Sequence, residues 1–400
     1  MQKINRNKIR FWLIEALVIF LPFSAWLVSL TGRPEISLIR DILVFSLFLV
    51  SLFEFKIDNF KKPLPIIILV YIFVILLSYF WVQASTAQWF RGAKFSITPM
   101  LLMLTLITSK LEKKEIRIIV KTIIGTSLIV IVLAILELLG FKLPTVSVLS
   151  GAGALESINL VGALKINRLA SVLAGPNALG LYLLVIISIL LGWREEIKHY
   201  KPILFFSALI LILTFSRSAW IGLIVLLLYL AIFKYKLSFV KISYLFILLV
   251  VLVSGIFYLS KKSQTLSQIF NHGLSTDMRL EQYNRIIKEK FEIGLLGRGA
   301  GAAGPSTQNR LDNGPNRWTE NTYLDIFEEF GLIGVMLFIS IILLILKESV
   351  KNRQSNFGRV AVLLIPSMMI AGFFINFYTG QVAVYCFFLA GGLSFERTQR

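Results

Sequence analysis

Long apolar segments alternate with short polar connections along the whole 400-residue chain. A helix needs about 20 apolar residues to cross roughly 30 Å of hydrocarbon, so each such segment predicts a membrane span. The pattern predicts twelve spans, at residues 11–31, 37–55, 64–83, 95–109, 117–140, 176–193, 202–215, 218–233, 241–259, 323–346, 360–378 and 380–395. We therefore expect an all-α integral membrane protein whose residues 1–400 form a single polytopic domain.

The basic residues between these segments are distributed unevenly. Of the 41 lysines and arginines, 23 lie in the N-terminal segment, in alternate connections or after the last span. Cytoplasmic loops of membrane proteins are enriched in lysine and arginine. This bias predicts that both termini are cytoplasmic and that the two longest connections, residues 141–175 and 260–322, are extracytoplasmic.

The same bias decides how two long apolar stretches are divided. Residues 202–233 are long for one crossing and short for two, but lysines flank both ends. Two crossings with an outer turn at Ser216-Arg217-Ser218 keep both ends on the cytoplasmic side. Residues 360–395 have the same pattern, with Thr379-Gly380 as the expected outer turn.

Composition and charge support a membrane protein and exclude other classes. Apolar residues make up 56% of the chain, charged residues 16%, and the mean hydropathy is +0.79. This excludes a soluble globular domain, a disordered chain and a disulfide scaffold. The net charge of +19 follows the loops, so the expected partner is the lipid bilayer and not nucleic acid. The one cysteine, Cys386, is expected to be a small buried hydrophobic residue.

The connection 260–322 is long enough to carry function. Within it, Leu280, Tyr283, Ile287 and Phe291 have helical spacing and predict an amphipathic helix near residues 279–292. This helix is expected to lie along the outer membrane surface or to cap a cavity; the alternative is packing on the rest of the loop. Residues 299–304 read GxGxxG, but no strand–helix unit surrounds them, so we expect close backbone approach to a substrate or a flexible turn.

Two charged positions at the predicted outer surface are candidates for chemistry. Arg217 lies between two apolar runs, where its guanidinium is expected to bind a phosphate or diphosphate, or lipid headgroups. Glu320 precedes the helix that opens at residue 323, for which Thr322 and Asp325 predict a capping box. Glu320 is expected to be a general base or an ordinary carboxylate favoured by the helix dipole.

Asp325, Glu328 and Glu329 share one face of that helix, which suits a cation, solvent or loop arginines. The histidines do not complete a metal site, because His199 is expected on the cytoplasmic side and His272 stands alone in the outer loop.

Four landmarks occur in order between residues 168 and 334. They are Arg168 with Gly175-Pro-Asn177-Ala-Leu-Gly; Thr214-Phe-Ser-Arg217-Ser-Ala-Trp-Ile-Gly222; Arg279 with Gly294-Leu-Leu-Gly-Arg-Gly-Ala-Gly301; and Asn321, separated by nine residues from Gly331-Leu-Ile-Gly334. In this order and spacing the sequence resembles the O-antigen ligase and Wzy-type polysaccharide polymerase superfamily. The layout of spans, with a large outer loop between late spans, also resembles that family.

The resemblance implies a GT-C-like polytopic glycosyltransferase of the bacterial plasma membrane that needs no metal or other cofactor. Such an enzyme transfers a polyprenyl-diphosphate-linked oligosaccharide to a hydroxyl of a glycan, lipid or protein acceptor on the outer face of the membrane. The resemblance assigns diphosphate binding to Arg217 and Arg279. Residues expected to shape the pocket or bind substrate are Arg168, Asn177, Arg285, Arg298, Asn321 and Tyr323.

One position departs from the family pattern, because Glu320 stands where a histidine is usual. A carboxylate can accept the proton of the acceptor hydroxyl in place of an imidazole, so Glu320 is the expected base. Two alternatives remain, a transporter or flippase of lipid-linked sugars or small solutes, and a purely structural membrane protein. The unusual residues gather at the predicted outer surface and not at mid-membrane, which favours an enzyme.

Overall fold

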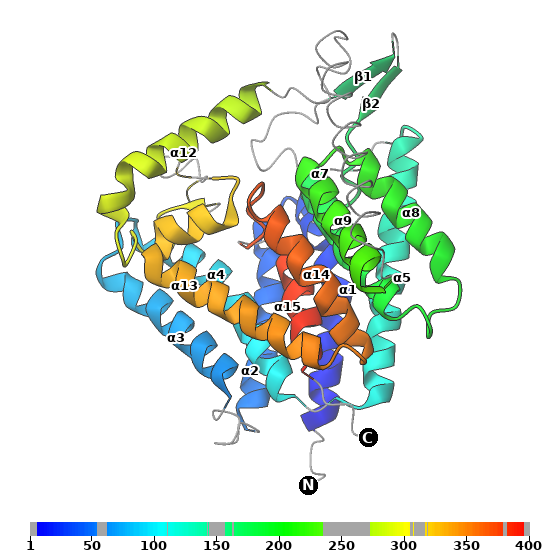
Figure 1. Cartoon of the computed structure of the whole chain (residues 1–400), viewed down its shortest axis with the longest axis horizontal. Helices are drawn as coiled ribbons and strands as arrows, with labels where there is room; N and C mark the ends of the chain where they lie inside the picture. The colour runs from blue at the N-terminus through cyan, green and yellow to red at the C-terminus, as the bar shows by residue number, and fades with distance from the viewer. Residues whose placement is uncertain are drawn as a thin grey trace.

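The computed structural model is a bundle of helices (Figure 1). It describes residues 6–53, 62–109, 111–141, 143, 157–161, 164–234, 273–304, 307, 317, 319–378 and 382–395. The helices are α1 (Arg6–Thr31), α2 (Leu38–Leu52), α3 (Pro63–Leu77), α4 (Thr86–Thr108), α5 (Lys113–Leu138), α7 (Pro176–Gly192), α8 (Tyr200–Leu213), α9 (Arg217–Tyr229), α12 (Gly273–Ile293), α13 (Thr322–Lys351), α14 (Asn356–Ala371) and α15 (Val382–Leu393). Shorter helical turns are η1 (Pro34–Ser37), η3 (Ser78–Phe80) and η4 (Leu230–Lys234).

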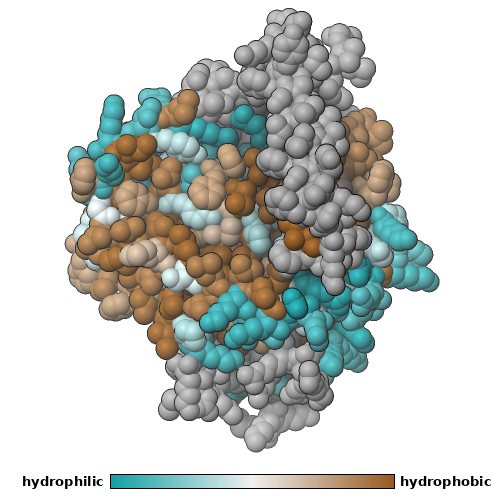
Figure 2. Space-filling model, viewed as in Figure 1, coloured by the Kyte–Doolittle hydropathy of each residue, from teal (hydrophilic) through white to brown (hydrophobic). Residues whose placement is uncertain are grey.

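The helices coincide with the apolar segments expected to span a membrane. Segment 241–259 lies outside the described residues, and each of the others overlaps a helix. Among the described helices, 5 are long and apolar enough to cross a membrane, and five shorter ones of 10–17 residues are also apolar. Figure 2 shows a hydrophobic surface belt between hydrophilic zones. The protein is therefore a multi-pass membrane protein, while the count of twelve crossings and the GT-C-like fold stay predictions.

Among the described residues, the strands form one small hairpin in the connection 141–175. Strands β1 (Ser157–Val161) and β2 (Leu164–Asn167) pair antiparallel, with Ser157 opposite Asn167 and Val161 opposite Leu164. The hairpin and α12 lie at one end of the bundle, and α1 begins at the other end (Figure 1). Helix α13 ends near the end of α15, where Ser349 and Ser394 share a hydrogen bond of 3.0 Å.

Helices α14 and α15 pack against helices from several parts of the chain. Helix α14 packs on α7, α9 and α13, and α15 packs on α4 and α7. The expected division of residues 202–233 is confirmed, because α8 ends at Leu213 and α9 begins at Arg217. The turn is Thr214-Phe215-Ser216, so Arg217 is the first residue of α9 and not the middle of the turn.

Helix α13 is kinked at Gly331, where φ is 63° and ψ is −162°. The kink frees backbone groups on both sides, and the loop after α12 pairs with them. The amides of Arg298 and Gly299 donate to the carbonyls of Glu328 and Glu329 at 2.9 and 2.8 Å, and the amide of Leu332 donates to Gly294 O at 3.2 Å. Only glycine fits at residue 331, because a Cβ there would overlap the backbone of the loop.

The glycines at 299 and 301 have a structural role. A Cβ on Gly301 would overlap Gln88 O in α4, and a Cβ on Gly299 would lie 2.7 Å from Val82. The amide of Gly301 also donates to the Glu329 carboxylate at 2.8 Å. These glycines let the loop pack tightly against α4, the residues before it and α13. The close approach that they permit is to the protein's own backbone, and an approach to a substrate stays a prediction.

One expected span ends early. Helix α14 ends at Ala371, and residues 372–378, expected in the span 360–378, form an irregular segment under the start of α13. The amide of Thr322 donates to Gly372 O at 2.9 Å, and its hydroxyl donates to Ile375 O at 2.9 Å. The segment is apolar enough to read as a helix, but its backbone groups pair with α13 instead. The expected turn at Thr379-Gly380 lies outside the described residues.

Candidate functional site

Arg168 connects two of the sequence landmarks. Its Nε donates to Thr214 O at 3.1 Å, and its terminal nitrogen donates to Asn177 Oδ1 at 3.2 Å and to Phe215 O at 3.4 Å. Asn177 lies in the first turn of α7. The guanidinium therefore holds the turn between α8 and α9 against the start of α7, and the structure brings Arg168 and Asn177 together.

The turn that precedes Arg217 is built from local hydrogen bonds. Phe215 has a positive φ of 51°, and the amide of Ser216 donates to Thr214 Oγ1 at 3.2 Å. The Ser216 hydroxyl caps α9 by accepting from the amide of Ala219. A Cβ on Gly180 in α7 would lie 2.7 Å from the Ala219 side chain, so this landmark glycine lets α7 and α9 approach closely.

Arg217 itself is half-buried at the first position of α9. Within the part of the chain that the structure describes, its guanidinium forms no hydrogen bond or ion pair. A half-buried cation at the end of an apolar helix is costly unless an anion pairs with it.

Arg279 in α12 pairs with Glu320, and both side chains are partly buried. Burial lowers the pKa of Arg279, and the positive charges of Arg217 and Arg168 lower it further. A positive charge lowers the pKa of another cationic group in this way only when the two groups are close. Arg168 and Arg217 therefore lie close enough to Arg279 to interact with it electrostatically, and Arg279 pairs with Glu320. We call these four residues the arginine site.

The start of α13 supports the arginine site. Asn321 is the N-cap: its Oδ1 accepts from the amides of Tyr323 and Leu324 at 2.9 and 3.1 Å. Its Nδ2 donates to Phe373 O at 3.1 Å, in the irregular segment 372–378. The hydroxyl of Tyr323 donates to Met369 O at 2.7 Å, and its ring packs on that of Phe373.

The expected capping box of Thr322 and Asp325 is wrong, because Asn321 does the capping one residue earlier. Asp325 instead accepts from the amide and hydroxyl of Thr319 at 3.1 and 2.5 Å and from Asn376. The buried Asp325 thus ties the segment before the helix to residues 372–378. A signal for this was present in the sequence, since Asn376 interrupts an otherwise apolar run.

Helix α12 carries its charged face toward the protein and its apolar face away from it. Leu280, Ile287 and Phe291 are 56%, 60% and 87% exposed. The helix begins at residue 273, earlier than the expected 279, and its Arg285 pairs with Glu328 of α13. The alternative of an apolar face packed on the rest of the loop is therefore wrong for these three residues.

Arg285 and Arg298 form ion pairs that anchor α12. Arg285 donates with both terminal nitrogens to the fully buried carboxylate of Glu328, at 2.5 and 2.9 Å. This pairing raises the pKa of Arg285. Arg298 is buried and lies 2.9 Å from Glu289 and 3.2 Å from Glu292. The acidic face of α13 thus pairs with loop and helix arginines.

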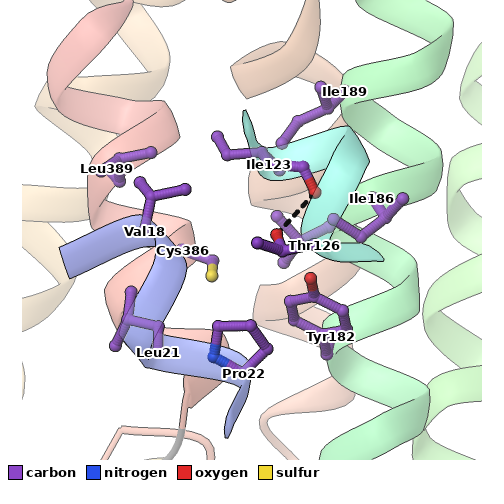
Figure 3. Close-up of a pocket in the computed structure, with 11 residues that line it drawn as sticks. Val18, Leu21, Pro22, Ile123, Thr126, Tyr182, Ile186, Ile189, Cys386 and Leu389 are labelled. Carbon is purple, nitrogen blue, oxygen red and sulfur yellow. Dashed lines mark hydrogen bonds between the residues drawn. The ribbon is translucent and has the colours of Figure 1, made fainter. Parts of the chain in front are cut away.

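A separate gap lies inside the bundle between α1, α5, α7 and α15 (Figure 3). Its lining is apolar apart from Thr126, Tyr182 and Cys386, and Thr126 donates to the carbonyl of Ile123 at 2.9 Å. Because no charged side chain lines this gap, it lacks groups for binding a diphosphate. In the described ranges, no three His, Cys, Asp or Glu side chains come together in a way that could hold a metal ion.

The fold and the arginine site define a class: a multi-pass helical membrane protein with a cluster of arginines at one end of its bundle. The family model described as O-antigen ligase matches residues 202–339. This match covers 138 of the 400 residues and supports the resemblance to the O-antigen ligase family seen in the sequence. The matched residues include Arg217, Arg279 and Glu320, while Arg168 and Asn177 precede them. A search of the curated proteins finds no match.

Proposed function

We propose that this protein is a metal-independent glycosyltransferase of the polysaccharide polymerase or ligase kind. It transfers a polyprenyl-diphosphate-linked glycan to an acceptor hydroxyl on the outer face of a bacterial plasma membrane, with both termini in the cytoplasm. The observation that carries the proposal is the meeting of Arg168, Arg217, Arg279 and Glu320, mostly within the segment that matches the O-antigen ligase family.

The charge of the arginine site fits a diphosphate. Three guanidinium groups and one carboxylate give a net charge of +2, in a partly buried setting where electrostatic interactions are stronger than in water. Planar guanidinium groups pair with phosphate oxygens through two parallel hydrogen bonds. In this proposal Arg217 and Arg279 bind the diphosphate directly, whereas Arg168 donates to the turn before Arg217 and orients it.

The reaction is a displacement at the anomeric carbon of the donor sugar. The acceptor oxygen forms a bond to that carbon, and the bond between the carbon and the diphosphate oxygen breaks. The departing diphosphate keeps the electron pair and gains negative charge, which the fixed arginines stabilise. The proton of the acceptor hydroxyl moves to Glu320.

The pair between Arg279 and Glu320 suggests how the base becomes available. A diphosphate and the Glu320 carboxylate compete for the same guanidinium. Once the diphosphate has taken Arg279, Glu320 loses its cationic partner and becomes a stronger base. Donor binding thus activates the group that deprotonates the acceptor.

The other predicted site residues act through these four. Asn321 and Tyr323 fix the start of α13, next to Glu320, and Asn177 fixes Arg168. Arg285 and Arg298 anchor α12, which carries Arg279. We therefore assign positioning roles to these residues in place of direct substrate contact.

Glycan analysis of bacterial cells lacking the protein and complemented with variants tests the proposal. Arg217→Ala, Arg279→Ala and Glu320→Ala are expected to insert normally and to abolish polymer extension or transfer. Arg359→Ala, at the surface pair with Glu195, is the matched control and keeps activity. Full activity in the Glu320 variant would overturn the mechanism.

The same cells distinguish a polymerase from a ligase. Loss of a polymerase leaves single repeats capped on their acceptor, whereas loss of a ligase leaves long polymer on its lipid carrier. Proteoliposomes separate either enzyme from a flippase: a flippase moves a labelled lipid-linked glycan across the bilayer, and the enzyme extends or transfers it on one face.

A further inference from the structure

A second group of charged side chains lies between α2 and α4. Arg40 donates from Nε to Asp41 Oδ1 at 3.1 Å, and Lys94 Nζ lies 3.0 Å from Asp41 Oδ2. The Arg40 guanidinium lies over the ring of the buried Tyr385 in α15, 4.6 Å from its centroid. We call Arg40, Asp41 and Lys94 the α2/α4 ion cluster.

The α2/α4 ion cluster lies on the other side of α4 from the loop that follows α12. One face of α4 carries Gly92, which packs on Gly301, and Ser96, whose carbonyl accepts from the Tyr378 hydroxyl at 3.3 Å. Lys94 is two residues from each of them along α4, so its side chain is rotated by about 200° around the helix axis relative to theirs. It therefore projects away from that loop, toward α2, while staying at the end of the bundle that holds the arginine site.

The cluster combines excess positive charge with access to the surface. Two cations share one carboxylate, so its three residues carry a net charge of +1. The side chains of Arg40 and Asp41 are 6% and 12% exposed, but that of Lys94 is 30% exposed. Ile42, which follows Asp41 on α2, and Phe90, which is four residues before Lys94 on α4, are exposed hydrophobic residues. A partly exposed cation between apolar side chains that face the bilayer is suited to bind the phosphate group of a lipid.

We propose that the α2/α4 ion cluster binds the phosphate group of a lipid through Lys94, with Arg40 and Asp41 holding Lys94 in place. Polyprenyl diphosphates and anionic phospholipids share this chemistry. Binding of a polyprenyl diphosphate here rests on the proposed function, because a polymerase must hold two lipid-linked glycans at once.

Reaction chemistry favours a separate site for the second diphosphate. The donor reacts at the sugar carbon that bears its diphosphate, so that diphosphate must lie in the arginine site. The acceptor reacts through a hydroxyl of its glycan, away from the sugar that bears its own diphosphate. The acceptor diphosphate therefore binds at a distance from Arg217 and Arg279, and the far side of α4 satisfies this requirement.

Native mass spectrometry of the full-length protein in lipid nanodiscs tests the proposal. Undecaprenyl diphosphate is added in one arm and phosphatidylglycerol in the other. Lys94→Gln leaves the neutral Arg40–Asp41 pair intact, so the bundle is expected to fold. This variant should bind one lipid fewer than the wild type or bind it at least about 10-fold more weakly. Lys94→Arg should retain binding, and Arg359→Gln is the control at a distant surface pair.

Each outcome decides a separate point. A loss of undecaprenyl diphosphate in Lys94→Gln supports an acceptor site, and a loss of phosphatidylglycerol alone supports a phospholipid site. Unchanged binding of both lipids overturns the proposal and leaves the cluster as helix packing. Arg279→Gln tests the donor site in the same assay, so that failure of the proposed function is recognised independently of Lys94.

Discussion

The ion pair between α12 and α13 offers the most direct test of how the arginine site is held. Arg285 donates twice to Glu328, whose carboxylate is 0% exposed, and the next cation, Arg317 Nε, lies 3.9 Å away. The substitution Arg285→Met keeps a long unbranched side chain but removes the charge. Glu328 is then left buried with one distant partner.

The expected cost follows from this burial. Removing one partner of a buried ion pair costs about 3–5 kcal/mol because the other charge stays uncompensated. Arg317 compensates part of the charge, so we expect about 2–4 kcal/mol for the docking of α12. Every 1.4 kcal/mol is about tenfold in an equilibrium constant, so the open population of α12 should rise on the order of 100-fold.

A double variant separates the charge effect from lost packing. Arg285→Met with Glu328→Met removes both charges and should recover most of the loss, since a well-packed apolar pair often replaces a buried ion pair at little cost. The measurement is hydrogen exchange of the α12 amides in detergent, including that of the buried Ile286. Binding of undecaprenyl diphosphate should fall in parallel, because α12 carries Arg279. Equal exchange rates in the wild type and both variants would refute the anchoring role.

Three further predictions concern packing, capping and pH. Gly301→Ala should lower the thermal midpoint, because φ is 79° and a Cβ would overlap α4, whereas Gly125→Ala, with nothing within 4 Å, should not. Asn321→Ala removes the cap of α13, which should cost about 1 kcal/mol in thermal unfolding. Asn321→Asp should recover only the part due to the cap, because a carboxylate cannot donate to Phe373 O. The hydrogen bond from the Arg359 guanidinium lowers the pKa of Glu195, so this ion pair stabilises the fold at neutral pH. The stabilisation is lost as pH falls below the ordinary carboxyl range and Glu195 becomes protonated. Glu195→Gln should therefore remove that part of the acid sensitivity seen in thermal melts.

The helices were predictable because apolar length is a local property of the sequence. Segment 202–233 shows this well: charge bias alone divided it, and α8 and α9 confirm the division. The early end of α14 was not predictable in this way. Residues 372–378 are as apolar as a span, and what stops the helix is the pairing of their backbone with Thr322, far away in the sequence.

The candidate site was predictable residue by residue but not as an arrangement. Order and spacing identified Arg168, Arg217, Arg279 and Glu320, yet nothing in the sequence states that Arg279 pairs with Glu320. The kink at Gly331 decides this, because it opens α13 to the loop that carries α12 into place. The α2/α4 ion cluster was missed, because Arg40, Asp41 and Lys94 appear separately as charges near the ends of predicted spans.

The carboxylate at residue 320 changes what the site can do compared with the family's usual histidine. Glu320 forms an ion pair with Arg279, so donor binding can release it as a base; a neutral imidazole has no such pair to lose. Glu320→His should therefore retain some transfer but make it depend on the ordinary histidine titration near pH 6.5, shifted lower by the adjacent arginines. Transfer by the variant should rise as pH increases through about 6, because only the neutral imidazole accepts a proton, while the wild type stays flat over that range. Rates of transfer between about pH 5 and 8 in reconstituted membranes measure this. A wild type with the same rise, or a folded variant inactive throughout, would show that residue 320 is not the base.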